Sequence, residues 1–371
     1  MTFFLLVLCI VIITIHLIFY LVVFNFFNFT KKKELPKNTI PISVIVCAKN
    51  EAENLKTLLP VLVKQQYSDF EIVLINDRSY DETEDIYSEF AEKYSFIKIV
   101  TVQESDHFYG NKKYALTLGI KAATNDCLLF TDADCLPKSN FWIQEMANHF
   151  NGETKIVLGY GPYETIANQF LNKLIRYETV ITALQYFSLA KMGSPYMGVG
   201  RNLMYSKQVF LKNKGYNQYV KIMSGDDDLL INQIANSTNT EICFEEQSHM
   251  TSNPKTTFKQ LVTQKRRHIS TVDYYQKKHK YLLGVYAFNR FLFWGVLPFT
   301  LLYVQTPKNQ IFIGSLIVFK WISEYIVVGI ASHKLKEKKL LAFIPILDFV
   351  LLLFQIYIFS CNSLSKPKKW S

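Results

Sequence analysis

Paired carboxylates at the end of an apolar run are the first residues whose spacing could do chemistry. Residues 128–137 read LLFTDADCLP, so Asp132 and Asp134 stand one residue apart directly after the run. Mg²⁺ and Mn²⁺ prefer oxygen ligands, and such a pair could hold one of these ions. Both carboxylates can face one ion only if the backbone turns there, and the nearby Pro137 favours a turn. The alternative is an ordinary solvated turn.

A second acidic stretch, SGDDDLL at residues 224–230, places Asp226, Asp227 and Asp228 side by side. Adjacent carboxylates repel one another, so at least one should have a raised pKa unless a cation lies near. A base whose pKa lies near the working pH is what proton removal from a hydroxyl requires. The alternative is an acidic helix start, which the helix dipole stabilises.

Polar residues follow two further apolar runs, in CAKNEAENL and INDRSYDET. Asp77 could accept a hydrogen bond from a ribose hydroxyl or from the N–H of a pyrimidine ring, because both are donors. Helix capping by Asn50, and by Ser79 or Asp81, is the competing interpretation. No glycine-rich dinucleotide or P-loop motif is present, so neither phosphate cradle is expected.

Alternating strands and helices must position these residues. The patterning predicts strands at 42–48, 70–76, 97–102, 127–132 and 155–161, with helices at 50–66, 81–94, 111–123 and 139–150. This order is typical of an α/β fold with a mostly parallel central sheet. Ligands of such sheets bind beyond the carboxyl ends of the strands, where strand order reverses. The candidate residues of the first, second and fourth strands fall at those ends.

Both ends of the chain are apolar enough to enter a membrane. Residues 3–28 contain no charged side chain, and Lys31, Lys32 and Lys33 follow them. We expect an uncleaved transmembrane helix at 1–30, a cytosolic domain at 31–280 because basic residues stay in the cytoplasm, and a C-terminal membrane region at 281–371. Three further segments, at about 282–304, 311–332 and 340–360, are candidate spans.

The basic loop at 333–339 should be cytoplasmic, but four crossings would place the C-terminal lysines, Lys366, Lys368 and Lys369, outside. One segment is therefore expected to lie in the interface or to turn back. Pro345 and Asp348 point to the last segment. The expected protein is a multi-pass membrane protein with two or three C-terminal spans.

The net charge of +10 does not indicate a nucleic-acid partner, because the lysines lie mostly beside the apolar segments. The six cysteines include no C-x-x-C pair, so neither a disulfide framework nor a cysteine metal site is expected. Free thiols fit a reducing compartment.

Seven motifs in this order resemble the family 2 glycosyltransferases over about residues 40–270. They are VIVCAKNEAENL, VLINDRSYDET, NKKYALTLGI, TDADCLP, GVGRNLMYSK, SGDDDLL and QKRRH. The resemblance implies an A-type fold, with helices on both faces of a mostly parallel sheet, and an inverting enzyme that uses a nucleotide-sugar donor. It also implies a divalent cation, Mg²⁺ or Mn²⁺.

The resemblance gives the acidic residues separate roles. It implies that Asp134 binds the metal and that Asp132 and Lys112 lie near the donor; a solvated lysine at a helix start is the alternative for Lys112. Asp226 aligns with the family's catalytic base and Asp227 is its close rival. Gly225 stands where the family has glutamate, so this match is imperfect.

The remaining motifs would line the nucleotide and the acceptor. The resemblance implies nucleotide binding by Ala48, Asn50, Glu51 and Asp77, and by Gln264 and Arg267 of the family pattern Gln-x-x-Arg-Trp. It implies an acceptor side shaped by Gly198, Gly200, Asn202 and His268. His268 replaces the usual tryptophan, which puts a polymer channel in doubt. For Lys265 and Arg266, contact with anionic headgroups is the simpler interpretation.

The expected function is transfer of a sugar, from UDP by preference, to a lipid or lipid-linked acceptor at the cytoplasmic membrane face. A processive polysaccharide synthase is the nearest alternative, although three C-terminal segments are few for a polymer channel. A non-catalytic membrane scaffold would be expected to have lost the acidic motifs. A nucleotidyltransferase would need a glycine-rich loop with arginine after the first strand, and CAKNEAE lacks it.

Overall fold

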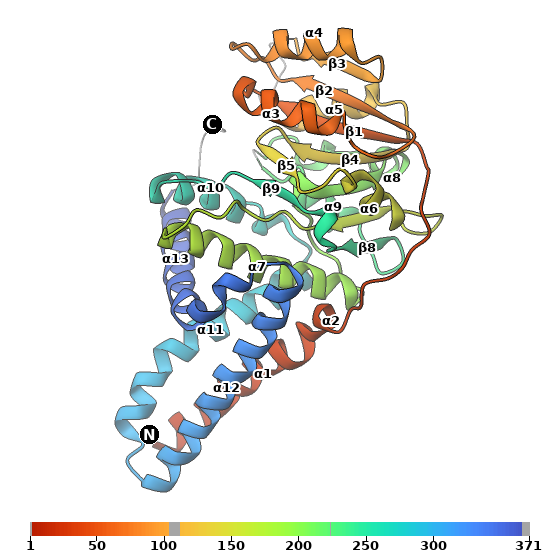
Figure 1. The fold of residues 1–371 in the computed structure, drawn as a ribbon. Helices are drawn as coiled ribbons and strands as arrows, with labels where there is room; N and C mark the ends of the chain where they lie inside the picture. Colours follow the sequence, from red (N-terminus) through yellow and green to blue (C-terminus); the bar gives the residue numbers. More distant parts are fainter. Residues whose placement is uncertain (1, 104–111, 223, 366–371) are drawn as a thin grey trace.

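A seven-stranded sheet forms the centre of the domain built from the middle of the chain (Figure 1). The structure is a computed structural model that describes residues 2–103, 112–222 and 224–365. The strand order is β3-β2-β1-β4-β7-β6-β8, and β7 runs antiparallel to both neighbours. The strands are β1 (Ile42–Ala48), β2 (Phe70–Asn76), β3 (Ile97–Thr101), β4 (Cys127–Asp132), β6 (Ile156–Gly159), β7 (Leu203–Ser206) and β8 (Thr240–Cys243).

Helices cover both faces of the sheet because strand side chains alternate between two cores. Val44 and Val46 of β1 face one core, whereas Ile45 and Cys47 face the other. The first core is closed by α3 (Ala52–Leu62), α4 (Thr83–Lys93) and α6 (Trp142–Asn148). The second is closed by α5 (Lys112–Ala122), α7 (Phe170–Lys191) and α9 (Asp228–Ile234). The α/β fold with a mostly parallel sheet is confirmed.

Strand order reverses between β1 and β4. From β1 the sheet continues through β2 to β3 on one side, while β4 lies parallel to β1 on the other. This is the switch point where α/β sheets bind ligands. Just beyond it, β5 (Cys135–Pro137) pairs with β9 (Met250–Ser252) in a separate two-stranded ribbon.

Helix α3, which follows β1, is capped differently from the sequence-based prediction. Asn50 does not cap it: α3 begins at Ala52, whose N–H donates to Asp81 Oδ2 from the loop after β2. Asn50 instead has a φ of 56° and accepts a hydrogen bond from the N–H of Tyr80. The two loops after β1 and β2 are thereby fastened to each other. Asn111, where the third helix was expected to start, lies outside the described residues.

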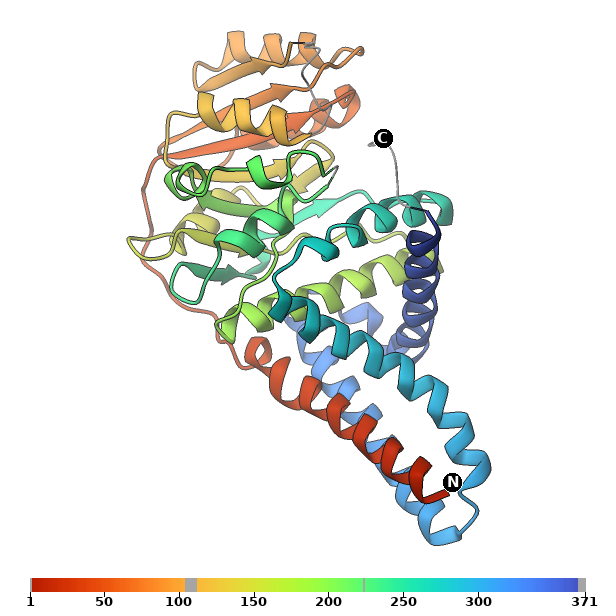
Figure 2. The ribbon, with the colours of Figure 1, turned by 180° about the vertical axis from the view of Figure 1, so that it is seen from behind.

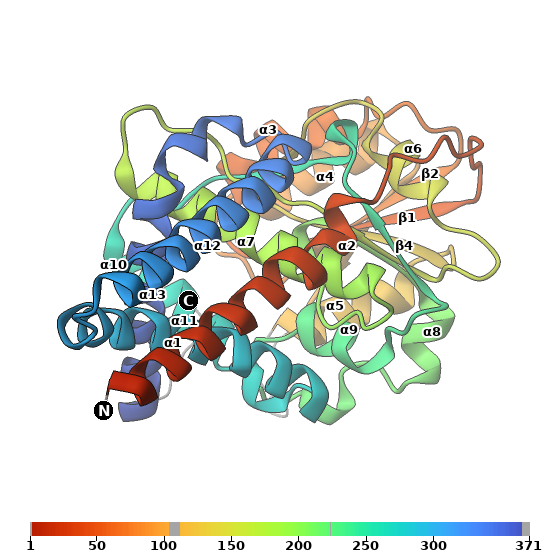
Figure 3. The same cartoon turned by 90° about the horizontal axis from the view of Figure 1, so that it is seen from below.

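Four apolar segments are long enough to cross a membrane, by length and composition, within the described ranges. The first combines α1 (Thr2–Leu17), a π-helical turn (Ile18–Val23) and α2 (Asn25–Asn28); the others are built on α11 (Lys277–Tyr303), α12 (Pro307–Lys334) and α13 (Ile344–Leu364). Figure 2 shows α1 and α11 projecting together away from the sheet, and Figure 3 shows α1 beside α12.

The last apolar helix does not follow this bundle to its far end. In Figures 1 and 2, α13 stays beside α7 and α10 (Phe258–Ile269), at the domain end of the bundle. Its C-terminal end is held there by a hydrogen bond from Arg266 Nε to Asn362 Oδ1 of 3.0 Å. Arg290 of α11 pairs with Asp348 of α13 at 2.5 Å, which ties the two helices together. The C-terminal lysines lie outside the described residues.

Candidate active site

A cavity of about 1500 Å³ extends from the switch point to the apolar helices. Its inner part is lined by the ends of β1 and β4 and by the loop before α9. Its outer part is lined by α7, α10, α11 and α13. The acidic stretches therefore open into the same space as the candidate membrane segments.

The end of β1 contributes Ala48, Asn50 and Glu51 to the cavity wall. Asp77, after β2, does not line it. Its side chain is fully buried, and Oδ1 accepts hydrogen bonds from Arg78 Nε and Nη2 at 3.0 and 2.7 Å. Its Oδ2 is also buried, and it has no hydrogen-bond partner among the described residues.

The chain turns between the two carboxylates after β4, as a shared ion would require. The strand ends at Asp132, Ala133 and Asp134 form a turn, and β5 begins at Cys135. One ligand atom each of Asp132, Asp134 and Cys135 lies within 4.8 Å of the others. Burial, and then the Asp132 carboxylate, raises the pKa of Asp134. A divalent cation would relieve this repulsion.

The Cys135 thiol is a poor ligand for such an ion. Burial and the neighbouring carboxylates hold its pKa well above the usual range, so it stays neutral. Neutral sulfur suits neither Mg²⁺ nor Mn²⁺, whereas carboxylate oxygens suit both. The donor set therefore fits a hard cation held by oxygen.

Lys112, the first residue of α5, joins the two acidic stretches. Its Nζ lies 2.5 Å from Asp132 Oδ1 and 3.6 Å from Asp226 Oδ2. Burial would lower its pKa, but the two carboxylates raise the pKa well above its ordinary value. Burial likewise opposes ionisation of Asp132, yet Lys112 outweighs it and lowers the pKa of Asp132. Lys112 is thus a fixed positive charge at the centre of the cavity.

Two of the three adjacent aspartates, Asp227 and Asp228, already accept hydrogen bonds from other groups of the protein. Asp227 Oδ2 accepts from the N–H of Gly200 and its Oδ1 from the N–H of Asp228, both at 2.7 Å. Asp228 Oδ2 accepts from the hydroxyls of Thr271 and Tyr275. Burial, and then the charges of Asp226 and Asp228, raises the pKa of Asp227 to about 7.

Asp226 is the aspartate left open to the cavity. Its side chain is 20% exposed and lines the cavity, and within the described ranges Lys112 is the group found beside its carboxylate. A carboxylate with unused lone pairs can accept a proton from a bound hydroxyl.

Helix α10 brings Gln264, Arg267 and His268 to the cavity wall. Gln264 Nε2 donates to the Tyr163 hydroxyl at 3.4 Å. The two basic residues beside them have protein partners. Lys265 Nζ pairs with Glu178 at 2.5 Å and Arg266 binds the end of α13, so both help to fix α10 in place.

The glycine-rich stretch before β7 supports the aspartates, and only part of it reaches the cavity. Gly200 lines the wall, and a Cβ there would lie 3.3 Å from Asp227 Oδ2. Asn202 is fully buried behind the wall, where its Nδ2 donates to the carbonyls of Tyr160 and Ser248. Gly198 is buried against Leu203.

Arg201 is a residue that sequence reasoning did not single out. It stands in the same GVGRN stretch, lines the cavity, and lies with its guanidinium 4.5 Å from the Tyr163 ring centre. Its Nε donates to the Gly161 carbonyl at 3.0 Å. Lys255, which lines the same wall, was also missed. For Arg201, the signal available in the sequence was its position inside a glycine-rich stretch.

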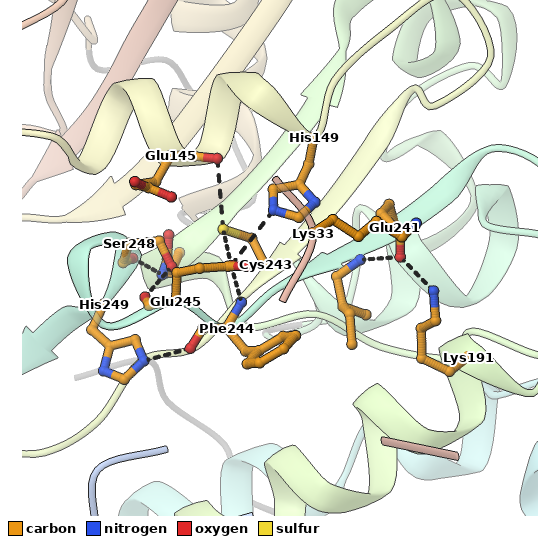
Figure 4. Close-up of polar contacts among 12 residues, drawn as sticks. Lys33, Glu145, His149, Lys191, Glu241, Cys243, Phe244, Glu245, Ser248 and His249 are labelled. Atoms are coloured by element: carbon orange, nitrogen blue, oxygen red, sulfur yellow. Dashed lines mark hydrogen bonds and ion pairs between the residues drawn. The ribbon is translucent and has the colours of Figure 1, made fainter. Parts of the chain in front are cut away.

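A second group of possible metal ligands lies away from the cavity, in the core near β8 (Figure 4). His149, Cys243 and Glu245 each place a ligand atom within 4.8 Å of the others, a proximity that the cysteine spacing did not indicate. Their atoms already bind one another: the Cys243 thiol contacts Glu245 Oε2 at 3.4 Å, and the Phe244 N–H donates to the same oxygen at 3.0 Å. The group fastens the loop after β8.

Comparison with known proteins relates residues 43–212 to one enzyme family. The model of the family described as glycosyl transferase family 2 matches residues 43–212. The chain is 26% identical over 192 residues to the 4,4'-diaponeurosporenoate glycosyltransferase of Staphylococcus haemolyticus, covering 51% of this chain and 50% of that one. It is 36% identical over 93 residues to the cholesterol galactosyltransferase of Borreliella burgdorferi, covering 25% of each. The chain spans half or less of the length of the curated relatives it matches.

A solved structure shares the fold across nearly the whole chain. The mannosyltransferase PcManGT from Pyrobaculum calidifontis, solved in complex with GDP-Man and Mn²⁺, superposes with a TM-score of 0.58 at 15% identity. The match covers 95% of this chain and 99% of that one. Residues 43–212 thus match the family 2 glycosyltransferases, and the chain has an A-type fold flanked by apolar helices long enough to span a membrane.

Proposed function

We propose that this protein transfers a sugar, with inversion, from a nucleoside-diphosphate donor to a lipid or lipid-linked acceptor at the cytoplasmic face of the membrane. The observation that carries this proposal is the continuity of one cavity from the acidic residues to α11 and α13. A soluble acceptor would not need apolar helices along the wall of the site. The relatives named for diaponeurosporenoate and cholesterol support an apolar acceptor.

The donor would lie over the ends of β1 and β4. We assign Asp134 to the divalent cation, Mg²⁺ or Mn²⁺, and Asp132 with Lys112 to the donor beside it. Bound there, the cation would neutralise the diphosphate leaving group. Arg267 and Gln264 stand on the same wall, and an arginine fork binds phosphate oxygens in pairs. We add Arg201, because its side chain lines the same part of the cavity.

UDP is our preferred donor nucleotide. Ala48, Asn50 and Glu51 would border the nucleoside. Asp77 would reach the base or ribose only after its contact with Arg78 is rearranged, because that contact occupies one of its oxygens.

Asp226 is the proposed general base. It would take the proton from the acceptor hydroxyl as that oxygen bonds to the anomeric carbon and the bond to the diphosphate breaks. Lys112 holds its charge between Asp226 and Asp132, which orients both carboxylates. Asp227 would position the loop, since both its oxygens accept backbone N–H groups.

The acceptor would approach from the side of Gly200 and His268. Asn202, which is buried behind this wall, would act by fixing the loop. The absence of tryptophan at position 268 and the apolar outer half of the cavity argue against a polymer channel. The convergence of Asp132, Asp134 and Asp226 on one cavity argues against a non-catalytic scaffold.

We further propose that α1, α11 and α12 cross the bilayer and that α13 stays at the cytoplasmic interface. Three crossings leave the basic loop at 333–339 and the C-terminus on the side of the catalytic domain, as basic residues prefer. The position of α13 beside α7 and α10 supports this arrangement.

The proposal is tested by a donor screen with the purified full chain and a membrane lipid extract. Each labelled nucleotide sugar is supplied with Mg²⁺ or Mn²⁺, and organic-phase products are identified by mass. We expect one UDP-sugar to label a lipid. Label that appears only in a water-soluble polymer would contradict the acceptor class.

A further inference from the structure

The outer half of the cavity is a gallery between two apolar helices. Its wall includes Leu283, Ala287 and Phe291 of α11 and Leu351, Phe354 and Ile358 of α13. We call this space the gallery. Its lining is predominantly aliphatic and aromatic, so it suits a hydrocarbon chain and not a sugar polymer.

The gallery opens at the outer surface of the two helices. Phe288, Phe291 and Phe359 line it and are 59%, 48% and 67% exposed, so its wall continues onto the surface. Both helices belong to segments that are apolar enough for a membrane. A chain could therefore enter sideways from the bilayer without passing through water.

Two of the charged side chains on the gallery wall, Arg290 and Lys265, pair with carboxylates of the protein, and Lys280 donates to the Asp273 carbonyl at 3.1 Å. Arg290 binds Asp348 at 2.5 Å and Gln355 Oε1 at 3.0 Å, across the gap between α11 and α13. Lys265 pairs with Glu178 at 2.5 Å where the gallery meets the acidic half. To bind Arg290 or Lys265, an anionic head group would have to displace a carboxylate from its cation, which is costly for buried pairs.

Beyond these pairs the gallery leads to Asp226, the aspartate that is left open to the cavity. Its carboxylate would repel a phosphate and accept a hydrogen bond from a hydroxyl. The charge pattern therefore favours a head group with a hydroxyl and no charge.

We propose that the acceptor is a neutral lipid ending in a hydroxyl, which enters from the bilayer between α11 and α13. This inference rests on the proposed sugar transfer. The hydrocarbon chain lies in the gallery and the hydroxyl reaches Asp226, which takes its proton. The hydroxyl oxygen then joins the anomeric carbon, and the nucleoside diphosphate leaves with the electrons of the broken bond.

Two glycines of α11 provide a matched pair of variants. Gly284 lines the gallery, whereas Gly295 does not, and a Cβ added at either position meets no atom within 4 Å. Gly284→Trp therefore places a large ring in the gallery without a clash of its Cβ. Gly295→Trp adds the same ring to the same helix outside it.

The first test is photocrosslinking of the full chain in phosphatidylcholine vesicles with a long-chain primary alcohol that carries a diazirine. We expect crosslinks in residues 283–291 and 351–359. Gly284→Trp should lower their yield at least about tenfold, an affinity loss near 1.4 kcal/mol, while Gly295→Trp keeps it. Equal yields in the two variants, or crosslinks confined to other helices, would overturn the gallery.

The second test compares a polyprenol with the polyprenyl phosphate of the same chain length, as competitors of crosslinking and as sugar acceptors. The polyprenol should compete better and become glycosylated. Stronger competition by the phosphate would overturn the neutral head group. Transfer to lipid that Gly284→Trp leaves intact would refute the gallery but keep the proposed function, whereas crosslinking without any sugar transfer would refute the acceptor role.

Discussion

The division of roles between Asp226 and Asp227 gives the sharpest test of the site. Asp227 has a pKa of about 7, so at pH 6 its side chain is mostly protonated and uncharged. Asparagine has nearly the same shape and is also uncharged. At pH 6, Asp227→Asn therefore changes little except one backbone hydrogen bond, because an amide nitrogen cannot accept. That loss should cost about 0.5–1.5 kcal/mol of stability.

Asp226→Asn removes the proposed base itself. General-base catalysis contributes about 10²–10⁴ in rate, or roughly 2.7–5.4 kcal/mol. Its carboxylate makes no backbone hydrogen bond within the described ranges, so the fold should tolerate the change. We expect turnover of the UDP-sugar at pH 6 to fall by about 10²–10⁴ in Asp226→Asn and by less than about tenfold in Asp227→Asn.

The assay is release of UDP from the UDP-sugar in lipid vesicles at saturating acceptor, with UDP binding measured by calorimetry. Binding of UDP should be similar in both variants. The reasoning is refuted if Asp227→Asn loses as much turnover as Asp226→Asn at pH 6, or if Asp226→Asn keeps full turnover.

Three further outcomes follow from the same contacts. Because the raised pKa of Asp227 favours its protonated form in the folded protein, its contribution to stability should be lost as pH rises from about 4 to about 7. The Tm of the wild type should accordingly fall relative to that of Asp227→Asn over this range, and parallel curves would exclude the effect. Lys112→Met removes the cation that lowers the pKa of Asp132, so the acidic limb of the pH profile of kcat/KM should move to higher pH. Lys121→Met, at the exposed end of α5, is the control. An acidic limb that does not move in Lys112→Met would disprove this role. A C-terminal reporter should lie on the same side of the membrane as one placed in the catalytic domain, and opposite sides would require α13 to cross.

The sequence was sufficient for the strands around the switch point. β1, β2 and β4 are mostly apolar runs whose bounds match the expected ranges, because strands buried on both faces need apolar residues along most of their length. The expected last strand, 155–161, is shorter in the structure, since β6 ends at Gly159. The antiparallel direction of β7 was not predictable, because local patterning carries no information on strand direction.

Helix α7 was missed for a different reason. Its 22 residues are buried on most sides, including the polar side chains of Asn172, Arg176 and Thr179. A helix covered by neighbours on several faces has no regular alternation of apolar and polar residues. Its burial depends on the apolar helices that pack on it, and these come from distant parts of the sequence.

Within the site, residue types were predictable but their partners were not. The sequence places Asp132, Asp134 and Asp226 at strand and helix ends, and the structure brings them to one cavity. That Lys112 bridges two of these acids depends on α5 packing beside the loop before α9. Asp77 and Asn202 look equally available in sequence, yet both are buried behind the wall.

The most direct test of the proposed chemistry is metal-dependent release of UDP by the purified full chain. The wild type should turn over its UDP-sugar with Mg²⁺ or Mn²⁺ and stop when EDTA is added. Asp134→Ala should lose this turnover at every metal concentration while Asp85→Ala, at an exposed site on α4, keeps it. Full metal-dependent turnover in Asp134→Ala, or turnover of the wild type that EDTA leaves unchanged, would contradict the account.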